Sequence, residues 1–171
     1  SVLQTVDAFT DEVIDNFHNP SLKVRGYPLP FPSVVDDVRI RLGEISIWTG
    51  YNGSGKSEIL GQISLHLSGL GLKSLIASLE MSPAVVIGRL LRQHYKNELP
   101  SVEEIKQFAI DFRDRILLYD FVGTANIEDV LEVFKYAVRK YGVQYFVLDS
   151  LLKLSISGED FDGQRELINK L

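Results

Sequence analysis

The chain has 171 residues, of which 45% are hydrophobic and 24% are charged, as is typical of a globular protein with one domain and a real core. It contains no cysteine, which excludes disulfides and thiolate metal sites, and its three histidines lie too far apart to predict a structural zinc site. The net charge of −5 argues against a protein that coats nucleic acid through a uniformly basic surface, although it leaves a local basic groove open.

No apolar run approaches the roughly 20 residues that span a bilayer, and no signal peptide begins the chain. We therefore expect no membrane partner. The lack of cysteine fits a reducing compartment, and we expect the protein to act in the cytoplasm.

The N-terminal segment predicts a helix followed by an irregular linker. Asn19-Pro20 is a stop signal, and "RGYPLPFPSVV" then carries three prolines within five residues, too many for a helix or a central strand. A short amphipathic helix ahead of a linker commonly docks on a neighbouring surface, and a small domain of its own is the alternative. The helix is predicted from "TVDAFTDEVIDNF", whose apolar residues at helical spacing are Val6, Phe9, Val13, Ile14 and Phe17.

From Gly43 onward, β-rich runs alternate with helical patterns. This alternation predicts right-handed βαβ crossovers and a mostly parallel sheet flanked by helices, which is an α/β fold. The last strand, "VQYFVLDS", is nearly all apolar and is therefore expected to be buried on both faces. The expected strands are 44–50, 74–80, 116–121 and 143–150.

Several of the expected helices carry capping signals. Ser82 and Pro83 suit the N-cap and first position of a helix, and "SVEE" at 101–104 is a capping box. Asn126 is the expected N-cap of the most strongly periodic helix, and Gly142 is its expected C-terminal residue. The expected helices are 58–70, 83–96, 101–112 and 126–141, with a further one that starts near 162. The sequence halts inside that last pattern, so we expect the domain to be incomplete at its C-terminus.

The stretch "GYNGSGKS" matches G-x-x-x-x-G-K-[ST], the phosphate-binding loop, or Walker A motif, of the P-loop NTPases. Its glycines allow backbone N–H groups to curl around a phosphate, and the helix that follows adds its own free N–H groups. Lys56 is expected to reach the β- and γ-phosphates, and the Ser57 hydroxyl to bind Mg²⁺. A chance match is the alternative, with a probability on the order of one per cent. The predicted nucleotide-binding residues are Gly50, Tyr51, Asn52, Gly53, Ser54, Gly55, Lys56 and Ser57.

Two acidic residues follow expected strands. Asp149 ends "YFVLD" and is a candidate for the Walker B carboxylate that holds Mg²⁺ through water, or else it caps the next loop. Glu80 ends "SLE" and could deprotonate the water that attacks the γ-phosphate, or else it is a solvated residue before a helix. Tyr51 and Asn52, inside the loop, either touch nucleotide or a neighbour, or are simply exposed.

The segments "GEISIWTGYNGSGKSEILGQISLHL" and "GLKSLIASLEMSP" together resemble the motor domain of the DnaB-type hexameric replicative helicases, a branch of the RecA-like ATPases. The phrase "SLEM" is a signature of that group. The segment "ILLYDFVGTANIEDVLEVFKYAVRKYGVQYFVLDSLLKL" is similar to the phage primase-helicases and the mitochondrial helicase Twinkle. The similarity begins near Pro32, so it implies a helix and linker over 1–31 and a RecA-like ATPase domain over 32–171.

The resemblance implies that Lys56 and Ser57 serve the phosphates and Mg²⁺, that Asp149 is the Walker B carboxylate, and that Glu80 is the catalytic base. It also implies a hexameric ring in a bacterial or phage-infected cell, with ATP or another NTP bound between subunits. In such a ring a neighbour's arginine finger completes each site, central loops grip single-stranded DNA, and the N-terminal helix packs on the next subunit. The family's finger and most of its DNA loops follow the Walker B strand, so we expect this chain alone to bind nucleotide but to hydrolyse it poorly.

Other functions are compatible with the loop alone. A RecA-like recombinase or a clock-type ATPase shares the same core. A small-molecule kinase would require an acceptor pocket and an arginine-rich lid, of which the sequence shows no sign. A nucleotide-dependent interaction module that has lost catalysis is disfavoured by the intact Glu80 and Asp149.

The remaining conspicuous side chains have simpler interpretations. Arg89, Arg92 and Lys96 recur along one side of a predicted helix, where a solvated face is favoured over a phosphate-binding stripe. We expect four aromatic side chains to pack in the core rather than to stack on bases, since stacking requires exposed rings. They are Trp48, Tyr119, Phe121 and Phe134.

Overall fold

The structure, a computed structural model, describes residues 4–18, 26–35 and 37–155. The chain divides into two units, Ser1–Ser46 and Ile47–Leu171, each of which is described by itself. The domain boundary predicted between residues 31 and 32 stays a prediction, and the helix predicted near 162 lies outside the described residues.

The first unit contains the predicted N-terminal helix. A single 3₁₀ turn leads into an α-helix, and neither of them buries a residue. The apolar stripe is present, but its side chains are exposed, to 91% at Val6 and 81% at Phe17. The predicted stop at Asn19-Pro20 lies outside the described residues. The elements are η1 Val6–Phe9 and α1 Thr10–His18.

The linker is not wholly irregular, contrary to the sequence-based expectation. β1 (Tyr27–Pro28) pairs antiparallel with β2 (Arg39–Ile40), so one of the prolines lies in a strand. Proline is tolerated here because a two-residue pair at a sheet edge does not require every N–H group to donate.

The second unit is built on a parallel sheet flanked by helices, which confirms the predicted α/β fold. The strand order is β4-β3-β6, and both pairings are parallel. A short parallel pair, β5 with β7, lies outside this sheet. The elements are α3 Lys56–Gly69, β3 Ser74–Ser78, α4 Pro83–Tyr95, α5 Val102–Phe112, β4 Ile116–Leu118, β5 Ala125–Asn126, α6 Ile127–Tyr141, β6 Tyr145–Asp149, η2 Leu151–Lys153 and β7 Leu154–Ser155.

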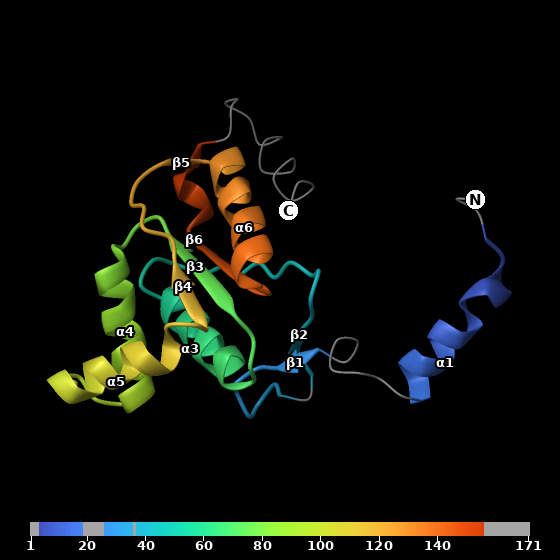
Figure 1. Ribbon diagram of the computed structural model, residues 1–171, viewed down its shortest axis with the longest axis horizontal. Helices are drawn as coiled ribbons and strands as arrows, with labels where there is room; N and C mark the ends of the chain where they lie inside the picture. The colour runs from blue at the N-terminus through green and yellow to red at the C-terminus, as the bar shows by residue number, and fades with distance from the viewer. Residues whose placement is uncertain (1–3, 19–25, 36, 156–171) are drawn as a thin grey trace. The chain divides into compact units, whose positions relative to one another are not determined.

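The two faces of β3 pack into two separate clusters. Leu75, Ala77 and Leu79 point to one face, where α6 covers them with Val130 and Phe134. The intervening Ile76 points to the other face, towards α4 and the partly buried leucines of α3. Figure 1 accordingly shows α6 on one side of the strands and α3 with α4 on the other. Because successive side chains of a strand alternate between faces, helices on both sides bury the whole of β3.

The capping predictions for α5 and α6 are confirmed. The Ser101 hydroxyl accepts from the Glu104 N–H at 3.2 Å while the Glu104 carboxylate accepts from the Ser101 N–H at 2.7 Å, a complete capping box. The Asn126 side chain accepts from the Glu128 N–H at 2.9 Å, and Gly142 ends α6. Ser82 occupies the N-cap position of α4, but its side chain makes no capping hydrogen bond.

The strand predicted over 44–50 is wrong. Within the described residues, no backbone ladder includes this run, so the parallel sheet has three strands rather than four. Ile45 and Ile47 are about half exposed, and Trp48 is partly buried rather than part of the core. A β-rich run becomes a strand only where another strand offers its backbone groups, and here none does.

Other aromatic and apolar predictions hold with one adjustment. Tyr119 and Phe121 stack and pack against the α6 cluster, and Phe134 is buried within it, as predicted. β6 is partly buried rather than covered on both faces, and only Val147 is fully buried. No helix in the described part of the chain combines the length and apolar character needed to cross a membrane.

We expect Ile63→Ala to lower the free energy of unfolding by about 2–5 kcal/mol, because the fully buried side chain in α3 leaves a cavity. Ile110→Ala on α5 is the matched control, since it makes the same change at a side chain that is 57% exposed. Urea unfolding followed by circular dichroism measures both. Equal losses in the two variants would contradict the assigned core.

Candidate functional site

The predicted phosphate-binding loop leads directly into α3. Gly53 and Gly55 adopt positive φ angles of 77° and 86°, a region that side-chain-bearing residues rarely enter. Gly55 is the N-cap of α3, and its carbonyl accepts the Ile59 N–H at 2.9 Å, the first helical hydrogen bond. The loop therefore delivers the open N-terminus of a 14-residue helix, whose first N–H groups have no helical partners.

The Lys56 side chain folds back over the loop. Its ammonium group donates to the carbonyl oxygens of Gly50, at 2.8 Å, and Tyr51, at 2.9 Å. These acceptors are neutral, and anionic phosphate oxygens form stronger hydrogen bonds with an ammonium group. A phosphate that entered the loop could therefore take over Lys56.

Ser57 and Asp149 lie together. The Ser57 hydroxyl donates to the Asp149 carboxylate at 2.6 Å, across 92 residues of sequence. Asp149 is the last residue of β6 and is paired in register with Ser78, the last residue of β3. A hydroxyl and a carboxylate are both hard oxygen ligands of the kind that Mg²⁺ prefers. The two residues predicted to hold the metal are thus within reach of one ion or its water shell.

Glu80 stands at the same edge of the sheet, two residues beyond the end of β3. The pairing of β3 with β6 continues past its end, since the Leu79 N–H donates to the Asp149 carbonyl at 2.6 Å. The exposed Glu80 carboxylate then accepts the Ser150 hydroxyl at 2.7 Å. Sequence reasoning missed Ser150, although its position directly after the candidate Walker B carboxylate was a usable signal.

The other loop side chains make no comparable contacts. Tyr51 is 92% exposed, and Asn52 and Gly53 are exposed as well. Ser54 shapes the loop through its backbone, since its N–H donates to the Tyr51 carbonyl at 3.1 Å. The predicted contacts of Tyr51 and Asn52 with nucleotide stay a prediction.

A small cavity lies beside this group of residues. Its volume is about 30 Å³, and its lining includes Ser57, Ser78 and Asp149 together with Arg89 and Gln93 of α4. Ligand pockets are roughly ten times larger, so this cavity cannot receive a nucleotide. A triphosphate would instead lie on the open surface of the loop.

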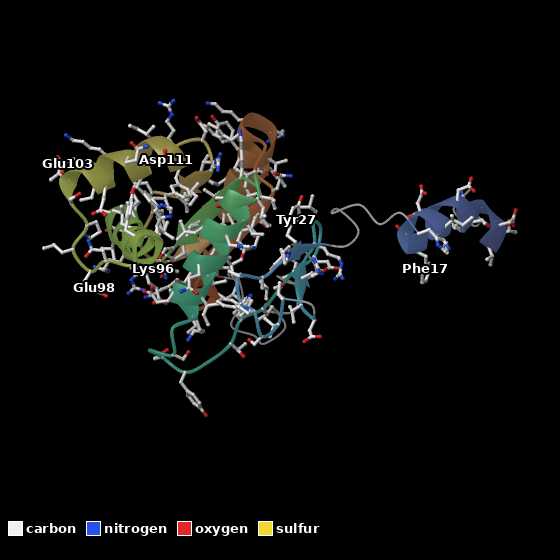
Figure 2. All side chains as sticks on the ribbon, turned by 90° about the horizontal axis from the view of Figure 1, so that it is seen from below. Phe17, Tyr27, Lys96, Glu98, Glu103 and Asp111 are labelled. Carbon is white, nitrogen blue, oxygen red and sulfur yellow. The ribbon has the colours of Figure 1, made fainter. Side chains whose placement is uncertain are left out.

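The predicted basic stripe on α4 is divided among acidic partners. Arg89 pairs with Glu58 of α3 at 3.3 Å, and Arg92 pairs with Glu98 at 3.9 Å. Lys96 lies just past the end of the helix, where Figure 2 shows it near Glu98. The arrangement favours a solvated helix face over a continuous phosphate-binding surface.

The comparisons with known proteins bear on the fold. No family model matches the chain. A solved structure of the ATPase domain of a DnaB-like helicase is similar, with a TM-score of 0.70 and 15% sequence identity over 99% of this chain and 66% of that one. The chain thus spans about two thirds of that domain. At this identity the similarity shows the fold: a RecA-like ATPase domain, with a parallel sheet flanked by helices.

Proposed function

We propose that this chain is the nucleotide-hydrolysing core of a DnaB-type helicase motor, which hydrolyses ATP or another NTP to translocate on single-stranded DNA. The proposal rests on the convergence of the loop residues Lys56 and Ser57 with Asp149 and Glu80. These four residues come from three separate segments, and each is of the chemical type that phosphoryl transfer to water requires.

Each residue has a distinct role in this proposal. Lys56 and the N-terminus of α3 bind the β- and γ-phosphates, and their positive charge offsets the charge that develops during transfer. Ser57 and Asp149 would hold Mg²⁺, Asp149 through water, and the bound ion supplies charge neutralisation at the phosphates. Glu80 accepts the proton of the attacking water, and the Ser150 hydroxyl holds one of its carboxylate oxygens in place.

The openness of the loop supports a site that a second subunit completes. Tyr51 is 92% exposed, and the adjoining cavity is too small to enclose a ligand, so this chain shields little of a bound triphosphate. Hydrolysis benefits from exclusion of water, which strengthens the electrostatic interactions in the site. The resemblance to ring helicases accounts for this with a neighbour that closes each site and contributes an arginine finger.

We expect Asp149→Asn to weaken binding of MgATP by about 10- to 100-fold, because the neutral amide holds the hydrated ion less well. Binding of ATP in EDTA should be unchanged. Isothermal titration of both ligands measures the difference. Asp114→Asn is the control, since that carboxylate is 82% exposed and precedes β4, at the opposite edge of the sheet. Loss of affinity in EDTA as well would argue against a metal role for Asp149.

We expect Glu80→Gln to lower kcat by about 10²- to 10⁴-fold with little change in nucleotide affinity, because only the proton acceptor is lost. Lys56→Ala should instead abolish binding and turnover together. Phosphate release is measured in the longest natural form of the protein, with and without single-stranded DNA. The exposed Glu103→Gln, on α5 (Figure 2), is the control. A wild-type turnover that single-stranded DNA fails to stimulate would rule out the helicase assignment.

A further inference from the structure

Glu58 places a negative charge beside the proposed phosphate site. It is the third residue of α3 and directly follows Ser57. A carboxylate in the first turn of a helix interacts favourably with the positive end of the helix dipole. A bound triphosphate would use that same positive end, so an unopposed Glu58 would both compete with the phosphates for it and repel them.

Two side chains of α4 hold this carboxylate. Arg89 Nη1 lies 3.3 Å from Glu58 Oε1, and Gln93 Nε2 donates to Glu58 Oε2. Gln93 Nε2 also donates to the Glu58 carbonyl oxygen at 2.9 Å. Glu58 is therefore bound through both carboxylate oxygens and its backbone to a neighbouring helix.

The packing between α3 and α4 is adapted to this contact. Gly61, in the middle of α3, faces Gln93, and a Cβ atom there would lie only 2.8 Å from Gln93 Oε1. A mid-helix glycine costs about 1 kcal/mol relative to alanine, and here its lack of a side chain admits Gln93. Gln93 Oε1 is buried and accepts no hydrogen bond from the described residues. Turning the amide over would satisfy no acceptor, since it would set that oxygen against the Glu58 carboxylate.

We propose that Arg89 and Gln93 are positioning residues for the phosphate-binding loop. They hold the Glu58 carboxylate against α4 and balance its charge, which leaves the N-terminus of α3 to the triphosphate. The inference rests on the proposed function, because it concerns how the same loop binds nucleotide. It also links the loop to the catalytic segment, since α4 begins three residues after Glu80.

The expected effect is modest, because the two side chains of the ion pair are 36% and 47% exposed and solvent screens them. We expect Arg89→Ala to weaken binding of the Mg²⁺ complex of AMPPNP, a non-hydrolysable ATP analogue, by about two- to fivefold. Glu58→Gln, which removes the repelling charge, should tighten binding relative to the wild type. In the double variant the loss caused by Arg89→Ala should disappear.

Three controls separate this role from general stabilisation. Arg92→Ala removes the next arginine of the same helix, whose partner is Glu98, and should leave the affinity unchanged. Arg89→Lys keeps the charge and should retain most of the binding. MgADP, which carries less negative charge than MgAMPPNP, should be less affected by Arg89→Ala, whereas a loss of folding would weaken both ligands equally.

Titration of the wild type and of each variant, with fluorescence or calorimetric detection, decides the outcome. Additive effects of Arg89→Ala and Glu58→Gln would overturn the inference, as would equal losses for the two nucleotides. Tighter binding by Glu58→Gln cannot arise from misfolding and would support it. If the wild type binds neither nucleotide, the proposed function fails as well. If the wild type binds and Arg89→Ala matches it, only the positioning role fails.

Discussion

The hydrogen bond between Ser57 and Asp149 is the contact that holds the site together. It joins the first turn of α3 to the carboxyl end of β6 at 2.6 Å. The two can meet only if α3 begins where the parallel strands end, as right-handed crossovers arrange. A one-residue slip of β6 would turn Asp149 to the opposite face of the sheet, away from Ser57. The chemistry of the site therefore depends on strand register.

That register is specified by burial on both faces of the central strand. All five residues of β3 are buried, and neighbouring residues belong to different clusters. Leu75 and Ala77 pack on the α6 side, and Ile76 packs on the side of α4. A slip of β3 would exchange these side chains between differently shaped surfaces and would disturb both clusters at once. The core thus stabilises the fold and also determines where Glu80 emerges from the sheet.

Three carboxylates surround the surface on which we place the phosphates, and each is held by a different partner. Such a concentration of negative charge would oppose nucleotide binding if the groups were free to turn towards the ligand. A hydroxyl holds a carboxylate without cancelling its charge, which suits a metal ligand or a proton acceptor. A guanidinium also balances the charge, which suits a carboxylate with no role in the reaction. The pairs are Asp149 with Ser57, Glu80 with Ser150, and Glu58 with Arg89.

Features that depend on neighbours a few residues apart could be predicted from the amino-acid sequence. These are the glycine loop, the period of each helix, the capping box at Ser101, and the alternation that predicts a parallel sheet. Asp149 could also be placed at a strand end, since a short apolar run that closes on an acid has few other interpretations. Which distant groups meet was decided by the folded chain. The partners of Glu80 and Glu58 lie on other elements, and the run 44–50 looks like a strand but finds no neighbour to pair with among the described residues. Such contacts join residues far apart in the chain, and no local pattern encodes them.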